Sequence, residues 1–142
     1  MVRRCKSWAR NDEGTAVIEF SILTPVFLLM LTGMMAYGIY FGAAHSLQQL
    51  AADAARTSIA GITREERADL VDNFIARNAS AYMLIDVDNL DHRVSTNPSD
   101  PDQYLVQLTY DASNLPIWNL YPPLPLPSST IVSGATIRLG GL

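Results

Sequence analysis

The sequence lacks most of the residues on which catalytic and metal-binding sites are built. Cys5 is the single cysteine, which excludes an intrachain disulfide and any paired-cysteine metal site. The two histidines, His45 and His92, are separated by a predicted helix and strand with no cysteine between them. Glycine-rich phosphate loops, serine elbows and zinc-binding helix motifs are also absent. We therefore expect no enzymatic activity, no cofactor, no metal and no small-molecule substrate.

Charged residues are absent from residues 20–52 and unevenly divided elsewhere. Residues 1–14 contain four basic and two acidic side chains, a balance of +2, whereas residues 15–142 contain six basic and twelve acidic ones, a balance of -6. A basic flank before an apolar segment stays in the cytoplasm, so we expect residues 1–14 to be a basic cytoplasmic leader. The acidic remainder is then exported, and it would repel phosphate, which argues against a nucleic-acid partner.

Residues 15–45 are predicted to form a transmembrane helix. This apolar segment is longer than the roughly 20 residues that span a bilayer and much longer than a secretory h-region. We therefore expect a retained single-pass anchor with a cytoplasmic N-terminus and an exported C-terminal domain. The alternative is a signal peptide that is cut near the small residues at positions 42–44.

Three further features lie within this predicted span. Pro25 lacks a backbone N–H, so we expect a kink in the helix there. Gly38 and Gly42 are spaced so that two helices could approach closely on one face, although glycine is common in membrane helices in any case. Tyr37 and Tyr40 are expected where the span leaves the membrane, as aromatic anchors at the interface.

Residues 46–142 are predicted to form an extracytoplasmic α+β domain. The span continues as a soluble helix to Gly61, because apolar residues recur every three or four positions. Thr63 and Glu66 form a capping-box pattern that opens a second, short helix over residues 64–79. After this helix the apolar period changes to two, which predicts a small antiparallel sheet of about three strands. The expected strands are residues 82–88 (extending as far as 94), 104–110 and 130–139.

A proline-rich connection at residues 115–127 joins the second and third predicted strands. Its five prolines exclude a helix or a central strand and favour an extended path. Trp118, Tyr121 and several leucines in this connection are costly to leave in water. Two interpretations remain open: these side chains fold back over the sheet, or they form a docking surface for another subunit.

Acidic residues cluster near the first two predicted strands, and they raise the question of a calcium site. Asp86, Asp88 and Asp91 are followed by Asp100 and Asp102. The spacing lacks the glycine and the terminal glutamate of a calcium-binding loop, so we interpret these residues as solvated acids at strand ends.

In the segment from Glu13 to Pro25, EGTAVIEFSILTP, the carboxylate of Glu19 stands at the head of the apolar run. A glycine, four residues, a glutamate and an aromatic residue resemble the processing site of type IV prepilins. Together with the basic leader, this segment resembles the start of TadE-family proteins, the pseudopilins of tight-adherence (Flp-type) pilus systems. Residues 47–57, LQQLAADAART, resemble the alanine-rich juxtamembrane helix of the same family.

The resemblance implies roles for individual residues. Gly14 would precede the cut made by a prepilin peptidase, Thr15 would become the new N-terminus, and Glu19 would correspond to the pilin glutamate that associates with a neighbouring subunit. Phe20 stands where typical Flp pilins have tyrosine, which favours a pseudopilin over the major pilin. The implied partners are the inner membrane, the prepilin peptidase, other Tad pilus subunits and the assembly platform proteins.

Two hypotheses of function follow from these observations. The first is a non-catalytic, minor pilin-like subunit of a Tad pilus assembly system that is anchored in the inner membrane and pilus-associated. The second is a bitopic accessory or sensory protein whose exported domain binds a partner without processing and without entering a filament. Glu19 bears on the choice, because a carboxylate inside a bilayer is costly without a partner, although at headgroup depth it could simply extend into water.

Overall fold

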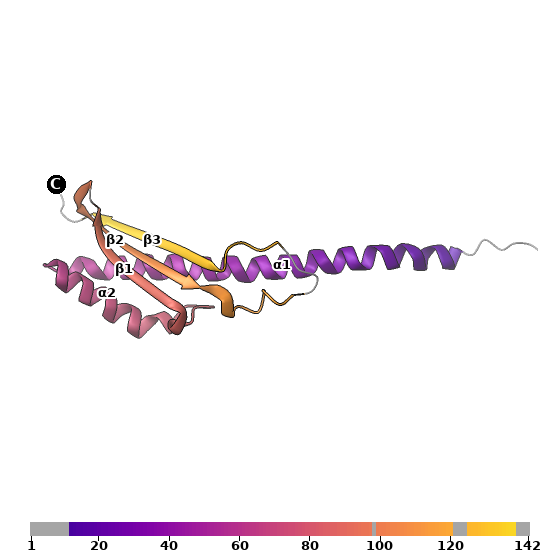
Figure 1. Cartoon of the computed structure of the whole chain (residues 1–142), viewed down its shortest axis with the longest axis horizontal. Coiled ribbons are helices and arrows are strands. Elements are labelled where there is room, and N and C mark those ends of the chain that lie inside the picture. Colours follow the sequence, from indigo (N-terminus) through magenta and orange to yellow (C-terminus); the bar gives the residue numbers. More distant parts are fainter. Residues whose placement is uncertain (1–11, 98, 121–124, 139–142) are drawn as a thin grey trace, which may run out of the picture.

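The computed structural model of the chain describes residues 12–97, 99–120 and 125–138 (Figure 1). They form an α+β fold, which confirms the predicted class. The helices are α1 (Asp12–Thr57) and α2 (Arg64–Asn78). The strands, in their order across one antiparallel sheet, are β1 (Leu90–Asn97), β2 (Asp100–Asp111) and β3 (Thr130–Arg138).

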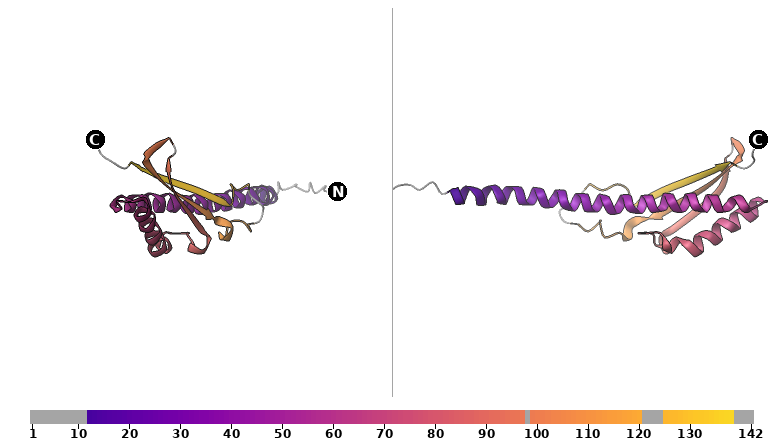
Figure 2. Two further views of the ribbon diagram at one scale, coloured as in Figure 1. Left: turned by 60° about the vertical axis from the view of Figure 1, so that its left-hand side comes forward. Right: turned by 180° about the vertical axis from the view of Figure 1, so that it is seen from behind.

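α1 has 46 residues and presents two different surfaces along its length. Its N-terminal half carries exposed apolar side chains and projects beyond the rest of the fold (Figures 1 and 2). Its C-terminal half packs against α2 and the sheet, and the alanines on its buried face let these elements approach closely. The buried α1 residues are Ala36, Ala43, Leu47, Leu50, Ala51, Ala54 and Ala55.

A short 3₁₀ turn, Ser58–Ala60, and Gly61 end the long helix, close to the end predicted from the sequence. Gly61 is required by a close approach, because a Cβ at this position would lie 2.6 Å from Cγ and 2.9 Å from N of Arg67. The Arg67 Nε also donates a hydrogen bond to the Gly61 carbonyl (2.9 Å). The turn between α1 and α2 is therefore tightly packed.

The predicted N-terminal cap of α2 is present. The Thr63 Oγ1 accepts a hydrogen bond from the Glu66 N–H (3.1 Å). The Glu66 carboxylate accepts from the Ile62 N–H (2.8 Å), which is one residue before the donor that a regular capping box would use. On the inner face of α2, Val71 and Ile75 are four residues apart and are buried against α1.

β2 is the central strand, and its alternating side chains cover α1 and α2. Val106 pairs with Val94 on β1 and with Ala135 on β3, which fixes the register of the sheet. The inward-facing residues of β2 are all buried: Tyr104, Val106, Leu108 and Tyr110. The residues that alternate with them are half-buried and face away from the helices, so the helices pack on one side of the sheet only.

The first strand begins later than the sequence predicted. Residues 82–88 form turns and not a strand, and β1 starts at Leu90. The side chain of Asp86 accepts from the Asp88 N–H (3.2 Å) and opens a 3₁₀ turn, Val87–Asn89. Short acidic side chains compete for backbone donors in this way, and this competition outweighs the alternation of apolar residues. Leu84, in the same loop, has a left-handed backbone (φ 65°).

The proline-rich connection packs mainly against its own fold. Leu115 and Ile117 are buried, and Trp118 is half-buried with its Nε1 donating to the Ala112 carbonyl (2.6 Å). The start of the connection is therefore packed into the fold, while its described far flank is held by hydrogen bonds from α1, so neither of the two open interpretations is confirmed. Tyr121, which belonged to the same prediction, lies outside the described residues.

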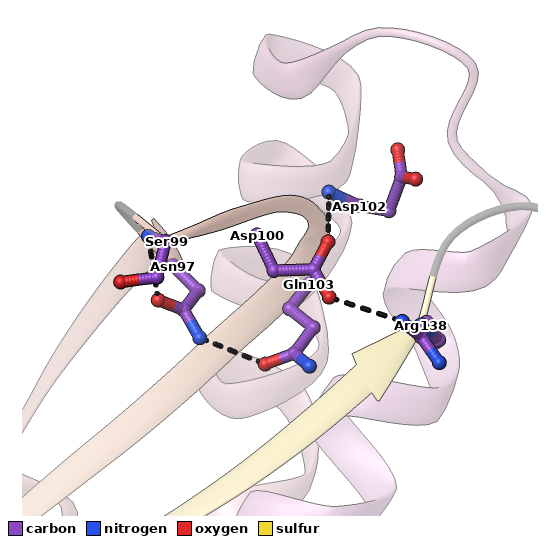
Figure 3. A network of polar contacts seen from close by, with 6 residues as sticks. All are labelled: Asn97, Ser99, Asp100, Asp102, Gln103 and Arg138. Carbon is purple, nitrogen blue, oxygen red and sulfur yellow. Dashed lines mark hydrogen bonds and ion pairs between the residues drawn. The ribbon is translucent and has the colours of Figure 1, made fainter.

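Of the acidic residues considered for calcium, Asp86 and Asp100 accept backbone hydrogen bonds in turns, and Asp91 lies in β1. Figure 3 shows the β1–β2 turn, where the Asp100 carboxylate accepts from the Asp102 N–H (3.2 Å) and pairs with Arg138 on β3 (3.2 Å). In the same view the Asp102 carboxylate points away from Asp100. In residues 12–97, 99–120 and 125–138 no group of three or more metal-ligating side chains comes together.

Candidate subunit-association segment

The exposed half of α1 has the length of a membrane span. Side chains from Gly14 to Met35 are exposed or half-exposed, and the exposed fraction is 70% for Phe20 and 72% for Met34. At about 1.5 Å per residue this segment is about 33 Å long, and the hydrocarbon core of a bilayer is about 30 Å thick. Within the described residues, α1 is the one helix long and apolar enough to cross a membrane.

The hydroxyl groups in this segment bond to the helix that carries them. Ser21 Oγ donates to the Val17 carbonyl (2.7 Å), and Thr24 Oγ1 donates to the Phe20 carbonyl (2.6 Å). Such bonds satisfy polar groups that would find no partner in lipid. α1 continues through Pro25 without interruption.

Glu19 is the single ionisable residue between Gly14 and Met35. Its side chain is exposed on α1, and among the described residues it makes neither a hydrogen bond nor an ion pair. Within a bilayer, an ionised carboxylate has a high free-energy cost unless a cation or several hydrogen-bond donors compensate its charge. The partner must therefore come from water, from lipid headgroups, from the leader or from another chain.

The residues of the predicted cleavage site lie in the first turn of the same helix. α1 begins at Asp12, so Gly14 and Thr15 are helical, and both are exposed. Thr15 is four residues before Glu19, about 6 Å along the helix axis. Phe20, beside the carboxylate, is also exposed. The structure thus brings all four predicted residues to one exposed end of α1.

The two glycines proposed for helix packing have different surroundings. A Cβ at Gly42 would lie 3.2 Å from Cδ1 of Leu84, so this glycine makes room for a residue of its own domain. A Cβ at Gly38 would meet no atom within 4 Å. The two positions are therefore not equivalent, and of the two only Gly38 has free space beside it in the described part of the chain.

Among the contacts with α1 that were not predicted from the sequence, two hold loops against the helix. The Tyr82 hydroxyl donates to the Asp53 carboxylate (2.8 Å), which also pairs with Arg56 (2.9 Å). Burial, together with the hydrogen bond and the negative charge of Asp53, raises the pKa of Tyr82 to about 12. Tyr82 and Asp53 are 29 residues apart, and no local pattern signals a contact over that separation.

The second unpredicted contact holds the proline-rich connection against α1. The Tyr37 hydroxyl donates to the Pro125 carbonyl, and the Tyr40 hydroxyl donates to the Ser128 carbonyl (3.2 Å). The sequence suggested both tyrosines as interface anchors because of their place at the end of the span, and no signal in it links them to residues 88 positions away.

Comparison with known proteins supports the resemblance on the same residues. A family model described as TadE-like protein matches residues 14–56. No curated protein and no solved structure matches the chain. The matched segment covers the exposed half of α1 and most of its packed half, and it includes Gly14, Thr15, Glu19 and Phe20. The match confirms the predicted resemblance over this segment, and the same helix is long and apolar enough to cross a membrane.

Proposed function

We propose that this protein is a minor pilin-like subunit, a pseudopilin, of a Tad pilus assembly system. In this proposal α1 anchors the subunit in the bacterial inner membrane, residues 1–14 are cytoplasmic, and the folded domain lies in the periplasm. A prepilin peptidase removes the leader after Gly14. The mature subunit then associates with other Tad pilus subunits and with the assembly platform, and it performs no catalysis.

One observation carries the proposal: Glu19 is the single ionisable group in the exposed span, and it has no partner among the described residues. Cleavage after Gly14 would create an ammonium on Thr15, one helical turn from this carboxylate. The ammonium of a neighbouring subunit could neutralise Glu19 in a low-dielectric setting, where an unpaired charge is strongly disfavoured. Subunits in the wrong register would leave both charges unpaired.

The composition of the leader supports processing. Four basic residues precede the proposed cut, and they hold an uncleaved chain at the cytoplasmic face of the membrane. After their removal, the new N-terminus is followed directly by the span, which is apolar except for Glu19. The match of the TadE-like family model begins at Gly14, the residue before the proposed cut.

The test separates processing from association with two variants. Glu19→Ala removes the charge, so membrane insertion and cleavage should continue while crosslinking to other pilus subunits and piliation are lost. Gly14→Leu should block the cut and leave a precursor of unchanged topology. N-terminal sequencing of the membrane fraction measures the cut directly, and a start at Thr15 is expected for the wild type and for Glu19→Ala.

A matched control is Glu65→Ala, which removes an exposed carboxylate from the first turn of α2, outside the span. This variant should assemble normally. If Glu19→Ala assembles as well as Glu65→Ala, the carboxylate serves only to extend into the headgroups. If the wild-type protein starts at Met1 or Val2, it is a bitopic accessory or sensory protein and not a processed pseudopilin.

A further inference from the structure

We propose that the described flanks of the proline-rich connection, residues 115–120 and 125–127, form with the following Ser128 a membrane-contact surface that rests on the bilayer beside α1. This proposal concerns the lipid surface on the side of the folded domain. It depends on the membrane anchoring of α1, and it requires neither cleavage after Gly14 nor entry into a pilus.

The first argument is the position of this surface along α1. The continuous run of exposed and half-exposed side chains ends at Met35, because Ala36 is the first fully buried residue of α1; beyond it, Phe41 is again exposed. If the exposed part fills the hydrocarbon core, as its length indicates, the membrane boundary lies at this level. The hydroxyls of Tyr37 and Tyr40, directly beyond it, hold the connection at Pro125 and Ser128.

The arrangement of the elements agrees with this position. Figure 1 shows the flanks of the connection leaving the sheet and running along α1 toward its exposed half. The view from behind in Figure 2 shows the same relationship. The β1–β2 turn lies at the opposite end of the sheet. Of the described loops joining elements of the domain, the connection therefore comes closest to the span.

The second argument is composition. No Asp, Glu, Lys or Arg occurs between Asp111 and Arg138, whereas the outer face of α2 and the distal β1–β2 turn carry several. Trp118, Leu120 and Leu126 are only partly buried by the core, and Pro125 is exposed. Tryptophan, tyrosine and uncharged apolar residues are favoured at the membrane interface, where a charged face would be expected to stay in water.

The third argument is the backbone of the connection. Prolines lack N–H donors, so Pro116, Pro125 and Pro127 present no unsatisfied donor to an interface that is poor in water. The Trp118 indole N–H is already used by the Ala112 carbonyl, and two carbonyls of the connection accept from the tyrosines of α1. Lowering this surface into the headgroup region therefore requires few new hydrogen bonds.

The experiment measures the depth of three positions in the full-length chain. Cysteines are introduced at Asn119, Ser99 and Leu23 in a Cys5→Ser background, labelled with a nitroxide, and the protein is reconstituted into phosphatidylcholine vesicles. Asn119 is exposed on the proposed surface, Ser99 is exposed in the distal β1–β2 turn, and Leu23 is exposed in the middle of the span. Frequent collisions of the nitroxide with oxygen indicate a label in lipid, and frequent collisions with a water-soluble nickel chelate indicate a label in water.

The label at Asn119 should be shielded from the nickel chelate, with a depth between those of the labels at Leu23 and Ser99. The proposal is overturned if the labels at Asn119 and Ser99 are equally accessible to the chelate. That outcome would leave the connection as a surface open to protein subunits.

A second measurement avoids any change in the connection itself. Trp8→Phe leaves Trp118 as the single tryptophan. Lipids brominated near the headgroup should cause a loss of Trp118 fluorescence, while lipids brominated at the chain end should not. Absence of quenching by both lipids would contradict membrane contact. Neither measurement depends on the pilus, so a negative result here leaves the proposed function intact.

Discussion

The Tyr82 hydroxyl donates a hydrogen bond to the Asp53 carboxylate across 2.8 Å and so joins the loop after α2 to the last turns of α1. Asp53 is simultaneously paired with Arg56 on its own helix. Two residues later in the loop, Leu84 packs beside Gly42 and has a left-handed backbone. The loop thus contacts α1 at two places, Asp53 and Gly42, and these contacts hold the start of the sheet against the helix.

Tyr82→Phe should destabilise the fold by about 1–3 kcal/mol, because it removes a hydrogen bond to a carboxylate that is largely shielded from water. Denaturant unfolding of the full-length protein in detergent micelles measures this change in free energy. Tyr104→Phe is the matched control. The buried Tyr104 hydroxyl has no hydrogen-bond partner among the described residues, so its removal should be neutral or slightly stabilising. Equal losses in the two variants would argue against a stabilising Tyr82–Asp53 bond.

The contribution of Tyr82 should depend on pH in the alkaline range. The folded protein raises the pKa of Tyr82 from 10 to about 12, so the native state holds this proton more tightly than the unfolded chain. The stabilisation is fully present below pH 10 and is lost as the pH rises through about 12. The difference in unfolding free energy between wild type and Tyr82→Phe should therefore narrow over this window. A difference that stays constant there would contradict the assigned cause.

Gly42→Val and Gly38→Val should differ, although both place the same side chain on α1. A valine at position 42 would press on Leu84, and overpacking of this kind costs about 1–3 kcal/mol. A valine at position 38 meets no atom of the described chain and should leave the unfolding free energy nearly unchanged. If Gly38 is instead used for packing between subunits, Gly38→Val will fold normally and lose crosslinking to its neighbours in the membrane.

The proposed topology predicts the outcome of limited proteolysis. Protease added to spheroplasts should remove the folded domain, beyond about residue 60, and should leave the N-terminal part of α1 protected by the membrane. A tag placed before Met1 should be inaccessible until the membrane is permeabilised in a Gly14→Leu background, which would retain the leader. Protection of the domain in intact spheroplasts would reverse the assigned orientation.

Local patterns in the sequence predicted most of the elements, because each depends on neighbouring residues. The apolar period and the Thr63–Glu66 cap predicted α2, and strict alternation predicted β2. The first strand was misplaced because Asp86 and its neighbours form a turn, where a polar side chain takes a backbone donor from the predicted ladder. The pattern of apolar residues is compatible with either a strand or a turn at this place, so it does not distinguish the two.

The candidate site also has one feature that the sequence predicted and one that it did not. Glu19 was evident from the sequence, since a lone charge in an apolar run is conspicuous without a structure. The attachment of the connection to Tyr37 and Tyr40 was not evident, because its partners are 88 residues away and are backbone carbonyls. A backbone carbonyl is present at every position, so no residue type marks it as an acceptor.

The continuity of α1 has a mechanical consequence. One unbroken helix forms both the exposed span and the packed half that supports the domain, and within the described chain no flexible linker separates the two. The domain therefore cannot turn independently of its anchor: a rotation or axial shift of the span moves the sheet and α2 by the same amount. A force applied to the N-terminal half of α1 would therefore move the whole folded domain with it.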